Sequence, residues 1–246
     1  MSIQNRPYQF DDVGCVFRGD CVKYGTPECK NPCWRQREWY WLLTNSYLPK
    51  KLQVDEKLIP TPQDLKVFEY LDYIRDNILE FVQSGSNLLI QGSTGNGKTT
   101  WVGKLIRAYL MRVSISNGFR PRAIFLNIPW YLSETRHSIS DNQTNLKEMR
   151  KNCSTIDLLA IDDIGASSLD NNFIHDEIYS IINQRVDNGL STIYTTNLSS
   201  KELEDNLGSR LCGRVLGSSE VVKITSTVDL RRPHSGFSFK EFSEGR

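Results

Sequence analysis

The stretch GSTGNGKT at residues 92–99 decides which fold this sequence can adopt. It fits the phosphate-loop pattern G-x-x-x-x-G-K-[ST], and it stands between an apolar segment, NLLIQ (87–91), and a segment with helical periodicity (99–113). Glycines let backbone N–H groups turn toward phosphate oxygens, and the following helix offers its positive end to the anion. A chance glycine turn is the alternative, and the strand–loop–helix context argues against it.

We therefore predict a nucleotide site in which Lys98 neutralises the β- and γ-phosphates and the Thr99 hydroxyl ligates Mg²⁺. The residues expected to bind the nucleotide are Gly92, Ser93, Thr94, Gly95, Asn96, Gly97, Lys98, Thr99 and Thr100.

Beyond the loop, apolar strand-like segments alternate with helical ones. The segments 123–128, 155–162, 191–196 and 220–225 have the pattern of buried strands, and 173–189 has that of a helix closed by Gly189. The segment from Asp64 to Val82 also has helical periodicity. This alternation predicts an α/β fold with a parallel sheet covered by helices on both faces.

Two carboxylates follow the predicted strand within LLAIDDIG (158–165). After a phosphate loop, such a pair indicates Asp162 as a Mg²⁺-binding residue and Asp163 as the group that orients the attacking water. An acidic residue that merely starts a loop is the alternative. Many related ATPases have glutamate at the second position, and the shorter Asp163 predicts slow turnover.

Polar and basic residues after the next strand complete the candidate site. Asn197, in YTTNLS, is expected to position the hydrolytic water, although an Asn that caps the following helix fits the same letters. Arg210 and Arg214 lie four residues apart, so they share a helical face. One of them, Arg214 before Arg210, is the candidate to enter a neighbouring subunit's site, and Arg231 is a candidate contact to the γ-phosphate from its own chain. Surface charges that serve only solubility are the alternative.

Composition and net charge limit the class of protein and its possible partners. The chain has 246 residues, 39% hydrophobic and 24% charged, as in globular proteins, and its net charge is only +1. A near-neutral chain makes general nucleic-acid binding dependent on local patches, on assembly or on ATP. No run of eighteen apolar residues and no apolar signal core is present, so we expect no membrane association and a cytoplasmic location.

Four of the six cysteines fall within CVFRGDCVKYGTPECKNPC (15–33), with the spacing C-x5-C-x7-C-x3-C. In a reducing compartment such a cluster more often holds a metal than a disulfide, and four thiolates suit a closed zinc site. An iron–sulfur cluster, and thiols that are unligated or in disulfides, remain alternatives. The predicted metal ligands are Cys15, Cys21, Cys29 and Cys33.

The chain is expected to contain three parts: a small cysteine module (1–48), a proline-bearing linker (49–63) and an ATPase domain (64–246). The module ends in WRQREWYWLLTNSYL (34–48), which is unusually rich in large aromatic rings. These rings either pack the module or form a site for a protein partner.

Four motifs in order, GNGKTT, LLAIDDIGA, TTNLS and LGSRLCGRV, resemble the DnaC/DnaI family of AAA+ replicative helicase loaders, within the IstB/DnaC branch, from bacteria or phages. The resemblance covers roughly residues 62–232. It implies an ASCE-type P-loop sheet of order 5-1-4-3-2 with an absent or vestigial lid. It also implies ATP, Mg²⁺, self-association through shared ATP sites, single-stranded DNA and a DnaB-type helicase hexamer as cofactors and partners.

The resemblance further implies that the N-terminal module docks on the helicase, and that the segment between the second and third strands contacts DNA through Arg136, His137, Lys147, Arg150 and Lys151. A solvated surface helix is the alternative for that segment.

The function that follows is an ATPase that loads the replicative helicase onto single-stranded DNA during DNA replication. Three other functions remain open: an IstB-like transposition helper, a nucleotide-gated adaptor with negligible turnover, and a small-molecule P-loop kinase. The TTN motif and the late arginine pair argue against the kinase, which would need a substrate lid.

Overall fold

The computed structural model describes residues 14–30, 32–114, 119–131, 143–165 and 172–230. In chain order its helices and strands are α1 (Trp34–Thr44), η2 (Lys50–Leu52), η3 (Pro62–Asp64), α2 (Leu65–Asp76), α3 (Ile78–Gln83), β1 (Asn87–Gly92), α4 (Lys98–Val113), β2 (Ala123–Asn127), α6 (Gln143–Thr155), β3 (Leu158–Asp162), α7 (Asn172–Asp187), β4 (Ser191–Thr196), α8 (Ser200–Ser218) and β5 (Ser219–Ile224). Within these ranges no helix is long and apolar enough to cross a membrane.

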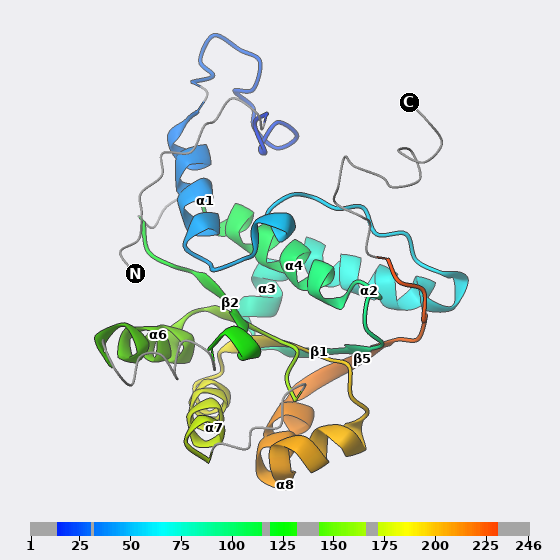
Figure 1. The fold of residues 1–246 in the computed structure, drawn as a ribbon. Helices are drawn as coiled ribbons and strands as arrows, with labels where there is room; N and C mark the ends of the chain where they lie inside the picture. The colour runs from blue at the N-terminus through cyan, green and yellow to red at the C-terminus, as the bar shows by residue number, and fades with distance from the viewer. Residues whose placement is uncertain (1–13, 31, 115–118, 132–142, 166–171, 231–246) are drawn as a thin grey trace, which may run out of the picture.

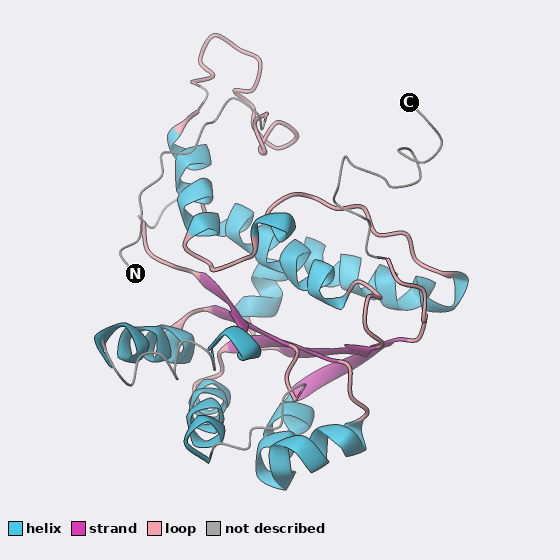
Figure 2. Cartoon of the chain, viewed as in Figure 1, coloured by secondary structure: helices cyan, strands magenta, loops and turns pink. Residues whose placement is uncertain are grey.

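The five strands form one parallel sheet in the order β2-β3-β4-β1-β5, which confirms the expected order 5-1-4-3-2. Each pair of consecutive strands is joined through a helix, as a parallel pair requires. Helices α1 to α4 lie on one face of the sheet and α6 to α8 on the other, as Figure 1 and Figure 2 show.

Two separate hydrophobic cores follow from the period-2 alternation of the strands. In β1, Leu88 and Ile90 point into the core beneath α4, whereas Leu89 points into the core covered by α7 and α8. All six residues of β1 are buried, because strands lie on both of its sides and helices on both of its faces.

The strand register brings the predicted site residues to one edge of the sheet. Gln91 at the end of β1 pairs with Thr196 at the end of β4, and Gly92 pairs with Ile224 at the end of β5. The phosphate loop, the two aspartates after β3 and Asn197 after β4 therefore all leave the sheet at its carboxyl edge.

The segment from Asp64 to Val82, which has helical periodicity in the sequence, contains the last residue of η3 followed by two helices. Helix α2 ends at Asp76, and α3 begins at Ile78. The Asn77 side chain donates a hydrogen bond of 2.9 Å to the Tyr73 carbonyl, and its backbone leaves the helical region with φ of −104° and ψ of 25°. A short amide side chain that bonds the preceding turn competes with the helix in this way.

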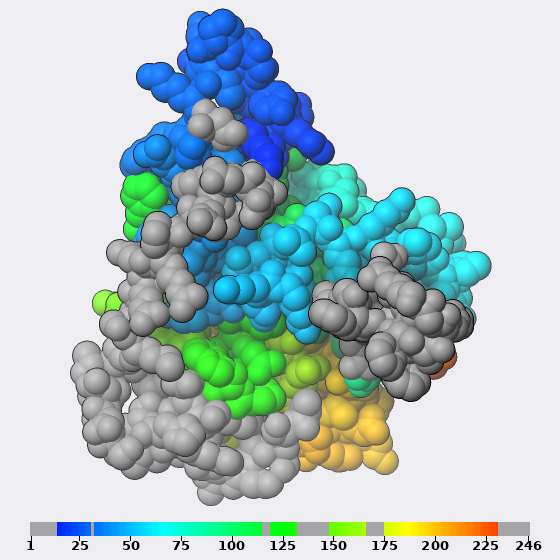
Figure 3. Space-filling model, turned by 45° about the horizontal axis from the view of Figure 1, so that its top comes forward, coloured from blue at the N-terminus to red at the C-terminus, as the bar shows by residue number. Residues whose placement is uncertain are grey.

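The N-terminal region and the linker rest on α4. Trp39 and Leu42 of α1 and Leu52 of the linker belong to the same core as Trp101 and Leu105 of α4. The described residues before α1, 14–30 and 32–33, project from the body of the molecule (Figure 3). The division into residues 1–48, 49–63 and 64–246 stays a prediction.

Two basic residues of α4 hold the linker. Lys104 and Arg107 both contact the Asp55 carboxylate, at 3.1 and 3.2 Å, and Arg107 also donates to the Val54 carbonyl. Both cations are therefore paired within the chain.

The segment that follows β5, residues 225–230, is called the strap here. It is fastened by Asp64, a carboxylate only 1% exposed at the end of the linker. Asp64 accepts hydrogen bonds from the backbone N–H groups of Thr225 and Ser226, at 2.7 and 3.0 Å, and from the Thr225 hydroxyl. The expectation of an absent lid concerns the residues after the strap, and residues 231–246 lie outside the described ones.

Asp64→Asn is predicted to destabilise the fold by about 2 kcal/mol at pH 7, because these charge-assisted hydrogen bonds weaken. Burial disfavours the ionised form of Asp64, but the hydrogen bonds from Thr225 and Ser226 outweigh it and hold the pKa below its ordinary value. A carboxylate with a depressed pKa stabilises the fold above its unfolded pKa of about 3.9 and loses this contribution as the pH falls further.

Urea unfolding of both proteins from pH 7 down to about pH 3 is the measurement. The difference in the free energy of unfolding between the wild-type protein and the Asp64→Asn variant should become smaller as the pH approaches about 3. Asp76→Asn is the control, because Asp76 forms an exposed ion pair with Arg75 and should change stability by less than about 0.5 kcal/mol. Equal effects of the two substitutions would contradict the role given to Asp64.

Candidate functional site

The phosphate loop turns sharply from the end of β1 into α4. Gly97 adopts a left-handed conformation (φ of +92°) immediately before the helix begins at Lys98. Such a φ favours glycine, so the third glycine of the motif serves the turn itself. The Lys98 side chain bends back over the loop, where its Nζ donates to the carbonyls of Gly92 and Ser93 at 2.8 and 2.7 Å.

Lys98 also joins the loop to the end of β4. Its Nζ lies 2.6 Å from the Asn197 side-chain oxygen, and the Asn197 amide donates to Asp163 at 3.2 Å. Asn197 thus stands between the loop lysine and the second aspartate, where the sequence placed a water-positioning residue. Burial lowers the pKa of Lys98, and the negative charges of Asp163 and Asp162 limit that shift.

Helix α8 does not need Asn197 as its cap. Ser199 accepts a hydrogen bond from the Glu202 N–H, and the Glu202 carboxylate accepts one from the Ser199 N–H, which together form a capping box. The alternative interpretation of Asn197 as a helix cap is therefore wrong for this structure.

The first aspartate, Asp162, faces the start of α4. The Thr99 hydroxyl donates to its two carboxylate oxygens at 3.0 and 3.3 Å, and the Thr195 hydroxyl donates at 2.7 Å. Burial raises the pKa of Asp162, and the Thr195 hydrogen bond opposes this effect. The hydroxyl of Thr99 and the carboxylate of Asp162 are hard oxygen ligands within one hydrogen bond of each other, so they fit a Mg²⁺ ion, which would neutralise phosphate charge there.

The strap crosses the phosphate loop from the side of β5. Leu230 donates its N–H to the Gly95 carbonyl at 2.8 Å, and the Ser93 hydroxyl donates to the Ser226 carbonyl at 3.0 Å. Gly95 has a φ of +84°, which favours glycine, and a Cβ there would lie 2.5 Å from the Asp229 carboxylate, which would have to move. The loop is thus fastened to β4 through Lys98 and to the strap through Gly95.

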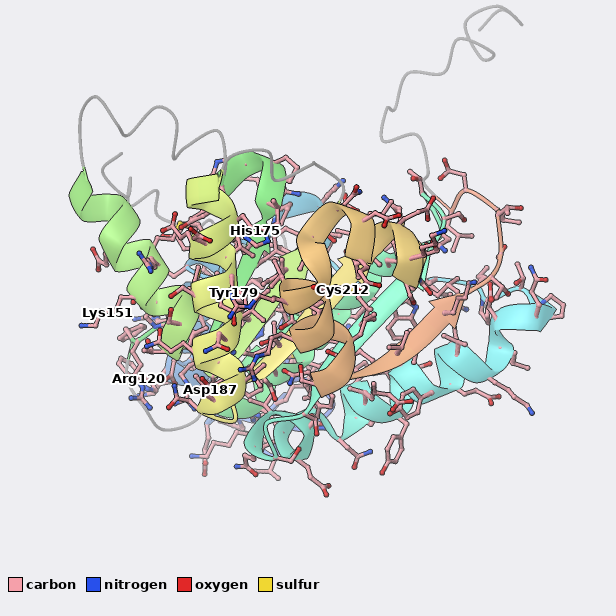
Figure 4. All side chains as sticks on the ribbon, turned by 90° about the horizontal axis from the view of Figure 1, so that it is seen from below. Arg120, Lys151, His175, Tyr179, Asp187 and Cys212 are labelled. Atoms are coloured by element: carbon pink, nitrogen blue, oxygen red, sulfur yellow. The ribbon has the colours of Figure 1, made fainter. Side chains whose placement is uncertain are left out.

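The paired arginines lie away from this site. Helix α8 is broken at Gly208 (φ of +73°), and both Arg210 and Arg214 belong to its second part. Arg210 is exposed, and Arg214 lies 3.6 Å from the carboxylate of Asp187 at the end of α7. Figure 4 shows Asp187 at the opposite end of α7 from His175.

Arg214 belongs to the amino edge of the sheet, because α8 leads directly into Ser219, the partner of Asn87 at the start of β1. A strand as long as β1 separates the two edges by roughly 17–20 Å. Arg214 therefore cannot reach the phosphate loop of its own chain. Arg231 lies outside the described residues.

The four N-terminal cysteines line one cavity, together with Phe17 and Gln36. Burial raises the pKa of Cys15, and the charges of Cys33, Cys21 and Cys29 add to this effect. All six cysteines are free thiols, and among the described residues no three His, Cys, Asp or Glu side chains are arranged as a metal site. The thiols are therefore gathered in one cavity, but the described residues do not show the expected four-cysteine metal module. Cys153 and Cys212 are buried packing residues.

Sequence reasoning missed two residues that organise the site, Thr195 and Asp64. Both are polar, and both are almost or fully buried. For Thr195 the sequence does contain a signal. A hydroxyl residue stands at the end of the apolar strand β4, and the neighbouring strand β3 ends in a carboxylate that the hydroxyl can bond. For Asp64 the sequence offers no such signal, because Thr225 and Ser226, the strap residues that it fastens, are more than 160 residues away.

The fold and the site together define a P-loop ATPase domain of the AAA+ type. The chain belongs to the family of IstB-like ATP binding proteins, which it matches over residues 72–234.

Relatives and solved structures agree with this assignment. The replicative helicase loader DnaI of Bacillus subtilis (strain 168) is 25% identical over 202 residues, which cover 77% of this chain and 59% of that protein. The chain thus spans well under two thirds of that relative's length.

The fold resembles the crystal structure of the DnaC helicase loader, with a TM-score of 0.57, 21% identity and coverage of 77% of this chain and 99% of that one. It also resembles AMPPCP-bound DnaA from Aquifex aeolicus, with a TM-score of 0.56, 21% identity and coverage of 72% and 51%.

Proposed function

We propose that this protein is an ATPase that loads the replicative DNA helicase onto single-stranded DNA and self-assembles when ATP binds between its subunits. The observation that carries the proposal is the continuous set of contacts Thr99–Asp162–Thr195 and Lys98–Asn197–Asp163, which joins all parts of a nucleotide-hydrolysing site. The similarity to DnaI, a replicative helicase loader, supports the biological role.

The chemistry assigned to the site is hydrolysis of the terminal phosphate. The phosphate loop and Lys98 would bind the phosphates, so Lys98 must exchange the carbonyls of Gly92 and Ser93 for phosphate oxygens. Asp163 and Asn197 would orient the attacking water. Because Asp163 is short and accepts a hydrogen bond from Asn197, we expect slow turnover that partners accelerate.

Self-assembly would place Arg214 in a neighbouring site. Within one chain it lies at the wrong edge of the sheet, and its present partner, Asp187, is more than half exposed and leaves the guanidinium partly free. An arginine supplied by a second copy stabilises transition-state charge and couples hydrolysis to assembly. Arg210, on the same part of α8, is the second candidate.

The N-terminal module would dock on the helicase. Trp34, 61% exposed, packs edge-on against Phe119, and Trp41 also packs edge-on against the same ring. A partly exposed aromatic cluster on a helix is typical of a protein interface. Four thiolates around zinc would make this module rigid, with an iron–sulfur cluster as the alternative metal group.

Single-stranded DNA would meet the assembled subunits rather than one chain. Arg150 and Lys151 of α6 are exposed, whereas Lys104 and Arg107 are paired with Asp55. Arg136 and His137 lie outside the described residues, as does the side chain of Lys147. Phosphate contacts add from subunit to subunit, so binding through the two exposed cations of α6 would depend strongly on assembly and on salt.

Lys98→Ala is predicted to abolish nucleotide binding and the capture of helicase on single-stranded DNA, because the phosphates lose their main cation. Mixtures of the protein, its cognate helicase, ATP and a labelled strand should form a complex on size exclusion that the variant does not form. If the wild-type protein stays monomeric and unbound with all components present, the loader proposal is wrong. A complex with a cognate transposase instead would favour an IstB-like transposition helper.

Arg214→Ala is predicted to keep nucleotide affinity but to lower turnover by about a thousandfold. Mixing it with Lys98→Ala should restore part of the activity, because the second variant supplies an intact Arg214 to the intact phosphate loop of the first. Arg210→Ala compares the two candidates: it should retain most activity, and the reverse pattern would assign the role to Arg210. Absence of recovery in the mixture would count against a shared site.

Cys29→Ser is predicted to reduce bound zinc to less than half and to weaken helicase capture, while ATP turnover without helicase is unchanged. Elemental analysis of the purified protein gives the metal content, and Cys212→Ser, in the second core, is the control. If the wild-type protein contains neither zinc nor iron, the metal-site prediction is wrong, and the cysteines are packing or redox-active thiols.

A further inference from the structure

Two neighbouring aspartates serve the same site, although adjacent residues of a strand point to opposite faces of the sheet. Asp162 is the last residue of β3 and faces Thr99. Asp163 is turned back toward Asn197, because its backbone adopts a left-handed conformation with φ of +56°. For a residue other than glycine this conformation is unfavourable by roughly 1 kcal/mol or more. Something in the surroundings must therefore hold it.

Thr195 of β4 provides that restraint through one hydroxyl group. Its Oγ1 accepts a hydrogen bond of 2.9 Å from the Asp163 backbone N–H and donates one of 2.7 Å to the Asp162 carboxylate. Its own carbonyl accepts a further bond of 2.9 Å from the Ile164 N–H. Three consecutive residues at the end of β3, from Asp162 to Ile164, are thus held by one residue of the neighbouring strand.

The hydroxyl group has no remaining freedom in this arrangement. Thr195 is 0% exposed, and its single proton is directed to Asp162 while a lone pair receives the Asp163 N–H. A valine has the same shape and would fit the same space, yet it can neither donate nor accept. The two functions of the side chain, filling space and orienting the aspartates, can therefore be separated by substitution.

We infer that Thr195 is a positioning residue that directs the two aspartates, Asp162 toward the metal-binding Thr99 and Asp163 toward Asn197. This inference rests on the proposed ATPase function and adds a residue to it. Because Thr195 would act through Asp162 and Asp163, its loss should affect the metal-dependent part of nucleotide binding and hydrolysis. Groups that orient a metal ligand in this way typically affect metal affinity or activity ten- to a hundredfold.

The test compares nucleotide affinity with Mg²⁺ and with EDTA, using a fluorescent non-hydrolysable ATP analogue and the full-length chain. In the Thr195→Val variant the gain in affinity that Mg²⁺ gives should fall at least tenfold, while affinity in EDTA stays within threefold of wild type. Thr195→Ser retains the hydroxyl and should restore the Mg²⁺-dependent gain to within threefold. Turnover, where it is measurable, should follow the same order with little change in KM.

Thr196→Val is the matched control. Thr196 is the adjacent residue of β4, equally buried, and its hydroxyl donates to the Ile164 carbonyl and accepts from the Leu198 N–H without touching either carboxylate. It should lower the melting temperature about as much as Thr195→Val does, but leave the Mg²⁺-dependent gain intact. If Thr195→Val does not fold, Thr195→Ala replaces it in the same comparison.

Three results would overturn the inference: a Thr195→Val protein that keeps its Mg²⁺-dependent gain within threefold, a serine variant as deficient as the valine variant, or an equal loss of affinity in EDTA. A wild-type protein whose nucleotide affinity ignores Mg²⁺ would overturn it together with the ATPase proposal. A wild-type protein that responds to Mg²⁺ but captures no helicase would refute only the loader function, and the result for Thr195 would still stand.

Discussion

The hydrogen bond between Lys98 and Asn197 joins two residues that are 99 positions apart, and the whole candidate site depends on the arrangement that makes it possible. In this parallel sheet β4 lies beside β1, so the end of β4 lies next to the phosphate loop that follows β1. The same order places β3 on the far side of β4, so that Thr195 lies between Asp162 and the phosphate loop. The pairing of these strands therefore brings together the Lys98 ammonium group, the carboxylates of the two aspartates and the Asn197 amide.

Buried polar groups hold the residues at the carboxyl edge of the sheet in one arrangement. Asp162, Lys98 and Thr195 are each at least 95% buried, and each has hydrogen-bond partners. Groups removed from water in this way are expensive to leave unpaired, so they favour one arrangement over its alternatives. At the amino edge of the sheet, the fully buried Arg185 has a similar structural role: it donates to the carbonyls of Cys153 and Ile156 at 2.8 Å and so ties α7 to the segment before β3.

The strap and the linker connect the nucleotide site to the rest of the chain. Asp64 fastens the strap, the strap contacts Gly95, and Leu58 of the linker lies against Gly97. The linker in turn is held to α4 by Lys104 and Arg107, and α1 packs on the same helix. A change in the phosphate loop therefore has a direct physical route to the N-terminal module, through contacts that the structure already contains.

The sequence alone determined the class of fold and the centre of the site. The phosphate-loop motif, the apolar strands and the aspartate pair depend on local patterns, which is why the parallel α/β sheet and the meeting of Lys98, Asp162 and Asn197 were predictable. The order of the strands was implied by the resemblance to the DnaC/DnaI family. Only the tertiary structure decided the break at Asn77, the pairing of Lys104 and Arg107 with Asp55, and the roles of Asp64 and Thr195. These depend on partners distant in sequence, or on competition between a side chain and its own backbone, and neither leaves a periodic signal in the residues themselves.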